Sequence, residues 1–395
     1  MDYRYDYLIV GGGMAADAAA KALRSAEANA QIGLITAESH APYERPPLSK
    51  ALWKNKAEAE IDLGTARAGV ELHLGRRAEV IDRAQHRVRD DHGNTYRYRK
   101  LLLATGATPR TLPFGGERVI AFRTLDDYHA LRRFAQPGAT IAVVGGGFIG
   151  AELAASLAAH GCRVTLVFPG EAIGAGRYPP RLAAWLTDVY RERGVDVRSG
   201  VRVTGGSAQA DGVVLQLSDG TRIETAAAVA GLGVTPNVEL AQQAGLDVSD
   251  GIEVDAQLRT SDADIFAAGD VAYFHSDALD RCQRVEHENA AIGMGNIAGR
   301  AMAGESVRYT TQPYFYSDLF EFGYEAVGLL DDTLDVVEQW TEPYREGVCY
   351  YLDGGRVRGV LLWNVWGQVE AARELIAARG PFDAENVRGR LPRMA

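Results

Sequence analysis

A repeated pattern of strand, glycine turn and alanine-rich helix is the feature that most constrains the fold. It occurs at YDYLIVGGGMAADAAAKALR (5–24) and again at TIAVVGGGFIGAELAASLAAHG (140–161). A second apolar strand follows each helix, at 31–35 and at 163–168. Two such βαβ units predict two parallel, doubly wound sheets, so the fold class is α/β with two Rossmann-like dinucleotide-binding domains.

The remaining segments predict further strands and a third domain. An apolar strand lies within 100–110, a hairpin turns at Asp219-Gly220, and 261–272 reads as a buried strand that ends in a turn. After about Tyr309 the sequence becomes richer in aromatic residues, with a hairpin around Gly354-Gly355 and a helix over 368–380. The predicted domains are a discontinuous first dinucleotide-binding domain (1–114 and 237–308), a second one (115–236) and a C-terminal α+β domain (309–395).

Composition excludes several classes of function. The net charge of −10 argues against a nucleic-acid partner or an anionic membrane surface. The chain has three cysteines, Cys162, Cys282 and Cys349, and their wide spacing predicts neither a redox disulfide nor a metal site. No apolar run reaches the roughly 18 residues that a membrane span needs. With a strand starting near Tyr5, this pattern predicts a cytoplasmic protein.

The two glycine turns match the dinucleotide-binding fingerprint. They are Gly11-x-Gly13-x-x-Ala16 and Gly145-x-Gly147-x-x-Gly150, each between an apolar strand and a helix. Glycine lets a diphosphate approach the backbone, and the helix N-terminus offers amides and a partial positive charge. We therefore expect one dinucleotide at each turn.

Carboxylates near the ends of the second strands are candidate ribose ligands. Glu38 has this position in the first unit and Glu171 in the second, whereas Arg177 lies close enough to Glu171 to accommodate a phosphorylated ribose instead. On balance the sequence favours NADH over NADPH. Two dinucleotide sites without a catalytic triad indicate FAD as prosthetic group and a nicotinamide nucleotide as diffusible reductant.

Several motifs along the whole chain resemble one flavoprotein family. LLLATGATPR (101–110) and DIFAAGD (264–270), together with the fingerprints, resemble flavoproteins of glutathione-reductase fold, and the absence of a CxxxxC pair points away from their disulfide-reductase branch. RPPLSKALW (45–53), RVEHENA (284–290), YFYSDL (314–319) and VLLWNVWGQVEAAREL (360–375) are similar to the ferredoxin-reductase-like branch, most of all to apoptosis-inducing factor and its bacterial relatives.

The resemblance implies roles for the stiff stretch PYERPPLSK (42–50). Arg45 would contact the FAD diphosphate, and Lys50 would lie beside the flavin and pair with Glu152 on the second helix. Pro46 and Pro47 fix φ and lower the entropic cost of holding both cations. The alternative for Lys50 is a solvated side chain on a surface loop.

The resemblance assigns the other site residues as well. On the FAD side they are Gly11, Gly13, Ala15, Ala16, Glu38, Arg45, Lys50, Thr105, Gly106, Arg110, Asp270, Glu286, His287, Phe315 and Tyr316. On the NAD side they are Gly145, Gly147, Phe148, Ile149, Gly150, Glu152, Glu171, Gly233 and Glu286. Lys50, Glu152 and His287 are the expected catalytic residues, and no metal ligands are expected.

Structural alternatives stay open for several of these residues. Asp270 could cap the segment that follows it, and His287 could be a helix-start residue. Phe148, Phe315 and Tyr316 could be core aromatics instead of walls of the nicotinamide and flavin sites.

The resemblance implies an FAD-dependent NADH oxidoreductase in which NADH gives hydride to flavin N5. Electrons would then pass to a ferredoxin- or rubredoxin-type carrier, to a quinone or to another acceptor. The alternative is an NADH-responsive interaction protein with slow turnover, in which a long-lived complex of reduced flavin and NAD⁺ is the functional state. A monomer and a redox-dependent homodimer both fit the sequence.

Overall fold

The computed structural model describes residues 1–391 and divides the chain into two compact units. Unit 1 comprises Met1–Arg45, Ala57–Thr108 and Thr235–Pro313, and unit 2 comprises Pro46–Lys56, Pro109–Val234 and the chain from Tyr314 onward. The short strands β7 (Ala107–Pro109) and β16 (Val234–Pro236) lie at two of the points where the chain passes between units.

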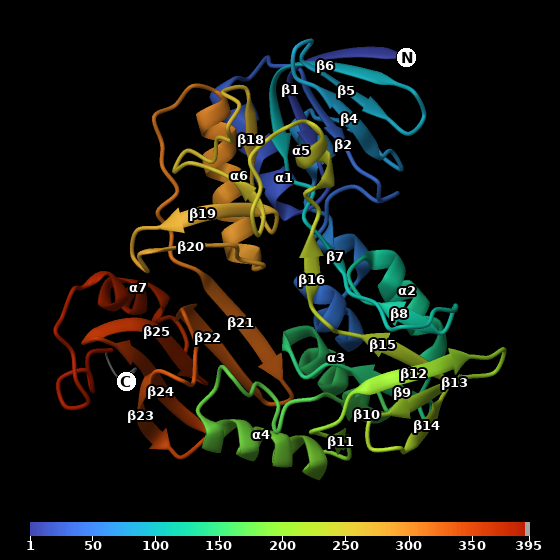
Figure 1. Cartoon of the computed structure of the whole chain (residues 1–395), viewed down its shortest axis with the longest axis vertical. Helices are drawn as coiled ribbons and strands as arrows, with labels where there is room; N and C mark the ends of the chain where they lie inside the picture. Colours follow the sequence, from blue (N-terminus) through green and yellow to red (C-terminus); the bar gives the residue numbers. More distant parts are fainter. Residues whose placement is uncertain (392–395) are drawn as a thin grey trace. The chain divides into compact units, whose positions relative to one another are not determined.

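A parallel sheet in the order β3-β2-β1-β6 is the centre of unit 1, and β18 pairs with the C-terminal part of β6 (Figure 1). The bounds are β1 Asp2–Val10, β2 Ile32–Ile35, β3 Glu71–His73, β6 Thr95–Leu103 and β18 Ile265–Ala267. The last residues of β1, β2 and β6 align in register, so the carboxyl ends of these strands meet at one edge. The predicted first βαβ unit is therefore confirmed.

Helix α1 (Met14–Ala26) packs closely against α6 (Glu288–Met302) in unit 1, and the two coils lie side by side in Figure 1. Small residues make this approach possible. A Cβ on Gly295 would lie 2.2 Å from the backbone oxygen of Ala15, and one on Gly299 would lie 2.5 Å from that of Ala19. The helix that follows the first glycine turn is thus held by backbone contact and not only by apolar side chains.

The other elements of unit 1 are short. They are η3 Glu58–Ile61, η4 Thr65–Ala68, β4 Ala78–Asp82, β5 Arg87–Asp90, α5 Glu239–Gln243, β17 Ile252–Glu253, β19 Ala272–Ser276 and β20 Arg281–Gln283.

Unit 2 contains the second parallel sheet, in the order β11-β10-β9-β15-β8. Its elements are β8 Val119–Ala121, α2 Leu125–Phe134, β9 Thr140–Val144, α3 Phe148–Ala159, β10 Arg163–Val167, α4 Pro180–Glu192, β11 Asp196–Arg198 and β15 Ala227–Ala230. The predicted hairpin at Asp219-Gly220 is present within the three-stranded sheet of β12 (Val203–Ala208), β13 (Val213–Leu217) and β14 (Arg222–Thr225). Both predicted doubly wound sheets are therefore observed.

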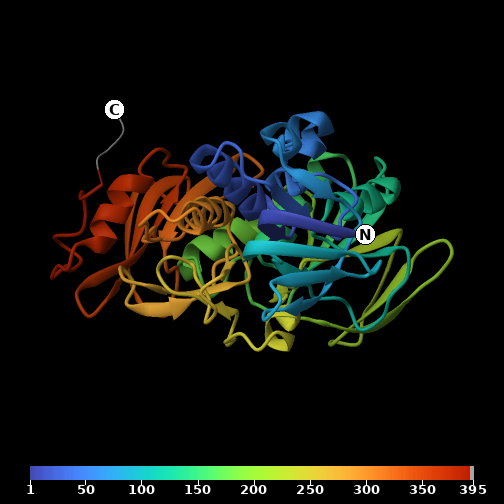
Figure 2. The ribbon, with the colours of Figure 1, turned by 90° about the horizontal axis from the view of Figure 1, so that it is seen from above.

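The C-terminal part of unit 2 is an antiparallel sheet in the order β21-β22-β25-β24-β23, with α7 packed on β22 and β25 (red in Figure 2). The bounds are β21 Tyr314–Leu319, β22 Phe322–Gly328, β23 Asp335–Glu342, β24 Glu346–Asp353, β25 Arg356–Trp363 and α7 Val369–Ala377. The hairpin predicted around Gly354-Gly355 joins β24 to β25. Trp363 is fully buried in this sheet, whereas Trp366 is 42% exposed.

A short segment of unit 2 comes earlier in the sequence than all of the unit 2 elements described above. It consists of the 3-10 helices η1 (Pro46–Ser49) and η2 (Ala51–Lys54) and is followed by the return of the chain to unit 1. We call residues 46–56 the strap. None of the helices within residues 1–391 is long and apolar enough to cross a membrane.

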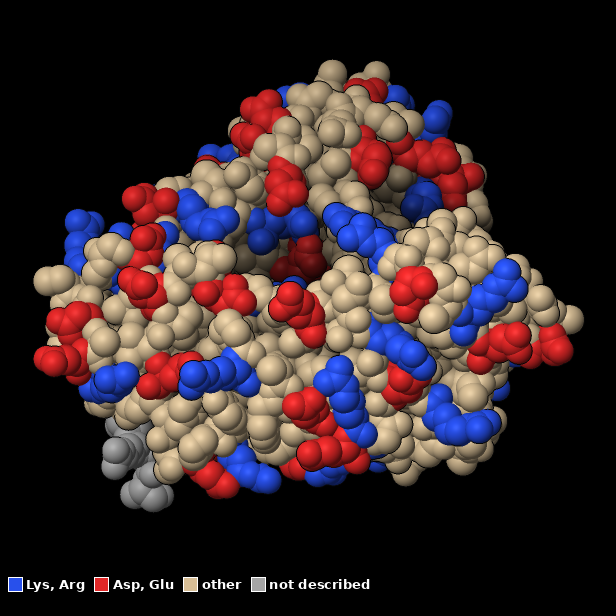
Figure 3. Space-filling model, turned by 60° about the horizontal axis from the view of Figure 1, so that its bottom comes forward, with Lys and Arg blue, Asp and Glu red and all other residues tan. Residues whose placement is uncertain are grey.

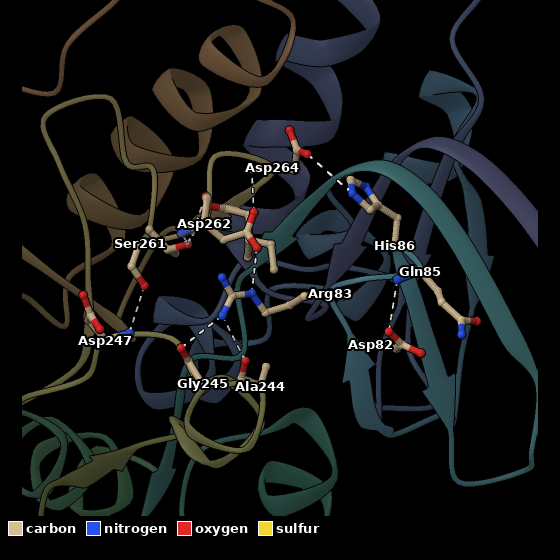
Figure 4. Close-up of polar contacts among 12 residues, drawn as sticks. Asp82, Arg83, Gln85, His86, Ala244, Gly245, Asp247, Ser261, Asp262 and Asp264 are labelled. Atoms are coloured by element: carbon tan, nitrogen blue, oxygen red, sulfur yellow. Dashed lines mark hydrogen bonds and ion pairs between the residues drawn. The ribbon is translucent and has the colours of Figure 1, made fainter.

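In unit 1, Arg83 fixes the turn after β4 to the segment around α5 and β18 (Figure 4). Its Nε donates to Asp262 Oδ2 at 2.7 Å, and its Nη1 donates to the carbonyls of Gly245 and Ala244 at 3.1 and 3.3 Å. The second oxygen of Asp262 accepts from the Asp264 amide at 2.9 Å. Burial would raise the pKa of Asp262, but these bonds from the Asp264 amide and Arg83 outweigh it and lower the pKa.

We expect Asp262→Asn to lower stability more at neutral pH than in acid. A carboxyl group with a lowered folded pKa stabilises the fold above its unfolded pKa of about 3.9, and this contribution is lost as pH falls through the folded value. The melting temperatures of wild type and variant should therefore differ clearly at pH 7 and converge toward pH 3. Asp188→Asn, in an exposed pair with Arg191, is the control. An equal difference at both pH values would contradict this prediction.

Candidate functional site

The first glycine turn leaves an open cradle at the start of α1. Gly11 has φ 128°, and a Cβ there would lie 2.0 Å from the backbone oxygen of Ala104. Gly13 is the N-cap residue of α1, and a Cβ on it would meet only Arg45 Nε, at 3.9 Å. A diphosphate can therefore reach the backbone at Gly13 with a guanidinium close by, which is the donor set that FAD needs.

Two expected FAD residues, Glu38 and Arg45, bind each other beyond the end of β2. Arg45 Nη2 pairs with Glu38 Oε1, and the Tyr43 hydroxyl donates to Glu38 Oε2 at 2.6 Å. Burial would lower the pKa of Arg45, but Tyr43, Glu38 and Asp270 raise it above its ordinary value. The structure thus brings Glu38, Arg45 and Asp270 into one electrostatic cluster.

Asn237 fixes the turn after β6, a contact that the sequence did not predict. Its side-chain amide donates to the backbone oxygen of Thr105 at 2.8 Å, and its backbone carbonyl accepts from the Thr105 hydroxyl at 2.8 Å. Its backbone amide donates to the carbonyl of Gly106, which has φ 65°. The Thr105 hydroxyl and the carbonyls of Thr105 and Gly106 are therefore engaged within the protein.

Glu286 and His287 lie at the start of α6. Glu286 Oε1 accepts from Arg284 Nη1 at 2.6 Å, and another bond from the same nitrogen reaches the Asp270 carbonyl at 3.1 Å. His287 is the N-cap residue of α6, but its side chain makes no capping hydrogen bond. Arg284 thus connects the two acidic residues that the sequence selected, although the sequence did not select Arg284 itself.

The second glycine turn repeats the geometry of the first one in unit 2. A Cβ on Gly145, at φ 122°, would lie 2.2 Å from the backbone oxygen of Gly231, and one on Gly150 would lie 1.8 Å from that of Gly145. Gly147 is the N-cap of α3 at φ −81°, and a Cβ on it would meet no atom within 4 Å. The cradle at Gly147 is open, as a bound nicotinamide nucleotide requires.

A hollow beside Gly147 is lined by residues of the second Rossmann fold and of β21. Among them are Phe148, Arg177 and Ser317. The Arg177 guanidinium lies 4.4 Å from the centroid of the Phe148 ring, and the Phe315 ring meets Phe148 edge to face at 5.1 Å. Glu171 is exposed and is not among the lining residues.

The remaining NAD-side residues lie near the same sheet edge. Gly233 has φ 80°, and its carbonyl accepts from the Arg110 backbone amide at 2.9 Å. Ile149, in the first turn of α3, is 40% exposed.

Lys50 and Glu152 form the buried ion pair that the sequence led us to expect. Lys50 Nζ lies 2.7 Å from Glu152 Oε1, and the two side chains are 12% and 4% exposed. The Lys50 ammonium also lies 4.9 Å from the centroid of the Tyr316 ring. The solvated-lysine alternative is therefore wrong.

Two serines that the sequence analysis did not select bind the same carboxylate. Ser49 donates to Glu152 Oε2 and Ser317 donates to Glu152 Oε1, each at 2.6 Å. Both serines stand next to selected residues, Lys50 and Tyr316. Only their burial, at 2% and 1% exposure, distinguishes them from ordinary surface serines.

The strap is anchored to α2 and α3 by its tryptophan. Trp53 Nε1 donates to the Leu48 carbonyl at 2.8 Å, and the Trp53 ring packs edge to face against Tyr128 and His160. The Ser156 hydroxyl donates to the Ser49 carbonyl at 2.7 Å. Lys50 is therefore held by unit 2, whereas Arg45, five residues earlier, belongs to unit 1.

Neither a disulfide nor a metal site accompanies this arrangement. Cys162, Cys282 and Cys349 are all unbridged thiols. Across residues 1–391 no group of three or more His, Cys, Asp or Glu side chains could hold a metal ion.

Comparisons with known proteins agree with this fold. Residues 5–295 match the family described as pyridine nucleotide-disulphide oxidoreductase, and residues 298–343 match the C-terminal domain of apoptosis-inducing factor. The ferredoxin–NAD(+) reductase component of the anthranilate 1,2-dioxygenase system of Burkholderia cepacia is 37% identical over 392 residues, which cover 96% of each chain. A putative apoptosis-inducing factor 1 of Drosophila melanogaster is 30% identical, over 96% of this chain and 64% of its own.

A solved structure is similar over nearly the same length. The putidaredoxin reductase chain in its covalent complex with putidaredoxin superposes with a TM-score of 0.87 at 32% identity, covering 95% of this chain and 93% of that one.

We expect Gly147→Val to weaken NADH binding at least about tenfold, because the added side chain fills the open cradle. FAD retention and melting temperature should stay at wild-type values, because valine can adopt the φ of this position. Calorimetric titration of the oxidised protein with NAD⁺, which has the same diphosphate as NADH but cannot reduce the flavin, measures the affinity of the cradle. The control is Gly115→Val, at another open position of unit 2. Unchanged affinity in the Gly147 variant would show that the dinucleotide lies elsewhere.

Proposed function

This chain belongs to the pyridine nucleotide-disulphide oxidoreductase family, and we propose that it passes electrons from NADH through FAD to a ferredoxin-type iron–sulfur carrier. It is an FAD-dependent NAD(P)H oxidoreductase without a redox-active disulfide. When bound, FAD supplies a ring that takes two electrons as hydride and can release them singly.

The buried Lys50–Glu152 ion pair is the main observation that supports this proposal. A surface ion pair contributes little, but a pair that is 12% and 4% exposed is costly to desolvate and persists only where its geometry is fixed. A fixed ammonium beside the flavin would stabilise negative charge that develops during reduction. We propose this role for Lys50, with Glu152 keeping the ammonium in place.

We propose that each of the two open glycine cradles binds one of the two dinucleotides. The cradle at Gly13, with Arg45 above it, holds the FAD diphosphate, and the cradle at Gly147 holds the NADH diphosphate. Phe148, between Arg177 and Phe315, covers the nicotinamide pocket until the nucleotide displaces its ring. The corresponding domains are 1–114 with 237–308 for FAD, 115–236 for NADH, and 309–395 as the C-terminal domain.

Relatives favour a ferredoxin-type acceptor. Two of the relatives are ferredoxin–NAD(+) reductase components, and a structural neighbour was solved in complex with putidaredoxin. Acidic and basic side chains are interspersed over the face drawn in Figure 3, so docking of a carrier would rest on local complementarity more than on net charge. A rubredoxin-type carrier or a quinone is the competing acceptor.

Turnover with defined acceptors tests the proposed function. We expect the purified protein to be yellow, to be reduced anaerobically by NADH faster than by NADPH, and to reduce a [2Fe–2S] ferredoxin catalytically and faster than a rubredoxin or a soluble quinone. A long-wavelength absorption band that persists in air after NADH addition, without carrier reduction, would instead support the slow redox-sensing function of an apoptosis-inducing-factor-like protein. A colourless protein that takes up no FAD would contradict both functions.

We expect Lys50→Met to slow flavin reduction by NADH about tenfold or more, because the positive charge is lost where reduction adds negative charge. FAD should stay bound, since Lys50 is held by unit 2 and the predicted FAD cradle lies in unit 1. Stopped-flow absorbance measures the rate. Lys54→Met, on the exposed side of the strap, is the matched control. Reduction of the Lys50 variant at the wild-type rate would refute the proposed role.

A further inference from the structure

Both oxygens of the Glu152 carboxylate are occupied. Oε2 accepts from the Ser49 hydroxyl, and Oε1 accepts from the Ser317 hydroxyl and from Lys50 Nζ. Glu152 is 3% exposed, and the two serines are 2% and 1% exposed, so water cannot readily replace these donors. We call Ser49 and Ser317 the serine clamp.

The clamp joins three segments of unit 2 that are far apart in the sequence. Ser49 is on η1 of the strap, Glu152 is on α3, and Ser317 is on β21 of the C-terminal sheet. The contacts span 103 and 165 residues. On β21, residues two positions apart share a face, and Phe315 contacts Phe148 while Ser317 contacts Glu152. One face of the C-terminal sheet thus contacts Phe148 and Glu152, which lie in the first turns of α3.

Lys50 alone cannot fix the carboxylate. Its ammonium contacts one oxygen, so the carboxylate could turn about its last torsion, which is broad and roughly two-fold for glutamate. Hydroxyl donors on both oxygens remove that freedom, and charge-assisted hydrogen bonds are about twice as strong as neutral ones. Because Ser317 shares Oε1 with Lys50, its hydroxyl determines where that oxygen meets the ammonium.

We propose that Ser317, with Ser49, is a positioning residue for flavin reduction: it fixes the Glu152 carboxylate and thereby the Lys50 ammonium. The inference rests on the proposed function of the Lys50–Glu152 pair and extends it to the C-terminal domain. That domain then completes the reductive site. The Ser317 hydroxyl donates to Glu152, so its effect on flavin reduction passes through Glu152 and Lys50. Ser317 also lines the hollow beside Gly147, so the test must separate this route from a direct effect on NADH binding.

The test compares variants of Ser317 in the complete FAD-loaded protein. Ser317→Ala removes the donor, Ser317→Cys keeps nearly the same volume with a weak donor, and Ser317→Thr keeps the hydroxyl. We expect the limiting rate of flavin reduction at saturating NADH to fall about tenfold in the Ala and Cys variants, which corresponds to the loss of one hydrogen bond to a charged group. The dissociation constant for NADH should change less than about twofold, and Thr should restore the rate.

A second measurement does not depend on activity. Amine acetylation of Lys50, followed by mass spectrometry of the oxidised protein without NADH, should be severalfold faster in the Ala and Cys variants, because Oε1 of Glu152 then loses the hydroxyl that fixes its position against the ammonium. Thr225→Val is the matched control: Thr225 is buried in unit 2, and the variant loses a hydroxyl bond to the Thr140 carbonyl without touching the serine clamp or Glu152. It should lower the melting temperature without increasing the acetylation of Lys50.

The outcomes separate the two proposals. If Lys50→Met slows reduction and all three Ser317 variants reduce and acetylate as wild type, the serine clamp is overturned and the role of Lys50 stands. If Lys50→Met itself reduces at the wild-type rate, the role of the pair fails and the inference falls with it. A rate that drops equally in the Ala and Thr variants would also overturn it, since the hydroxyl would then be irrelevant.

Discussion

A carboxylate removed from water needs partners on both oxygens, and this requirement organises the centre of unit 2. Glu152 has three donors: Ser49 and Lys50 on the strap, and Ser317 on the C-terminal sheet. An isolated buried charge would cost several kcal/mol, so strap, helix and sheet stabilise one another through this single group. The same contacts place the Lys50 ammonium at a fixed point, as the role that we propose for it in flavin reduction requires.

The glycine turns, unlike the contacts around Glu152, function by leaving space free of side chains. At Gly11 and Gly145 a side chain would run into neighbouring backbone, so both turns depend on the absence of a Cβ. At Gly13 and Gly147 the same absence opens room in which a diphosphate can meet helix amides. Two units with this arrangement, in a chain without a disulfide, form the framework on which FAD-dependent electron transfer from NADH operates.

Local patterns predicted most of the fold and part of the site. Apolar strands that lead through glycine into alanine-rich helices identified both Rossmann folds, and the Asp219-Gly220 and Gly354-Gly355 turns were found where expected. The Lys50–Glu152 pair was expected from resemblance and is present. The mutual pairing of Glu38 and Arg45 was not expected, because each had been assigned to a different part of the cofactor.

What the sequence by itself determined was the class of site: two dinucleotide cradles, a lysine on a proline-stiffened segment, and no closely spaced cysteine pair of the redox-active kind. These follow from backbone conformation and from spacing over a few residues, which local sequence controls. Only the tertiary structure decided which side chains meet around Glu152 and that Asn237 engages Thr105. Contacts across more than a hundred residues depend on how sheets and helices pack, and a serine carries no local signal of the carboxylate that it will bind.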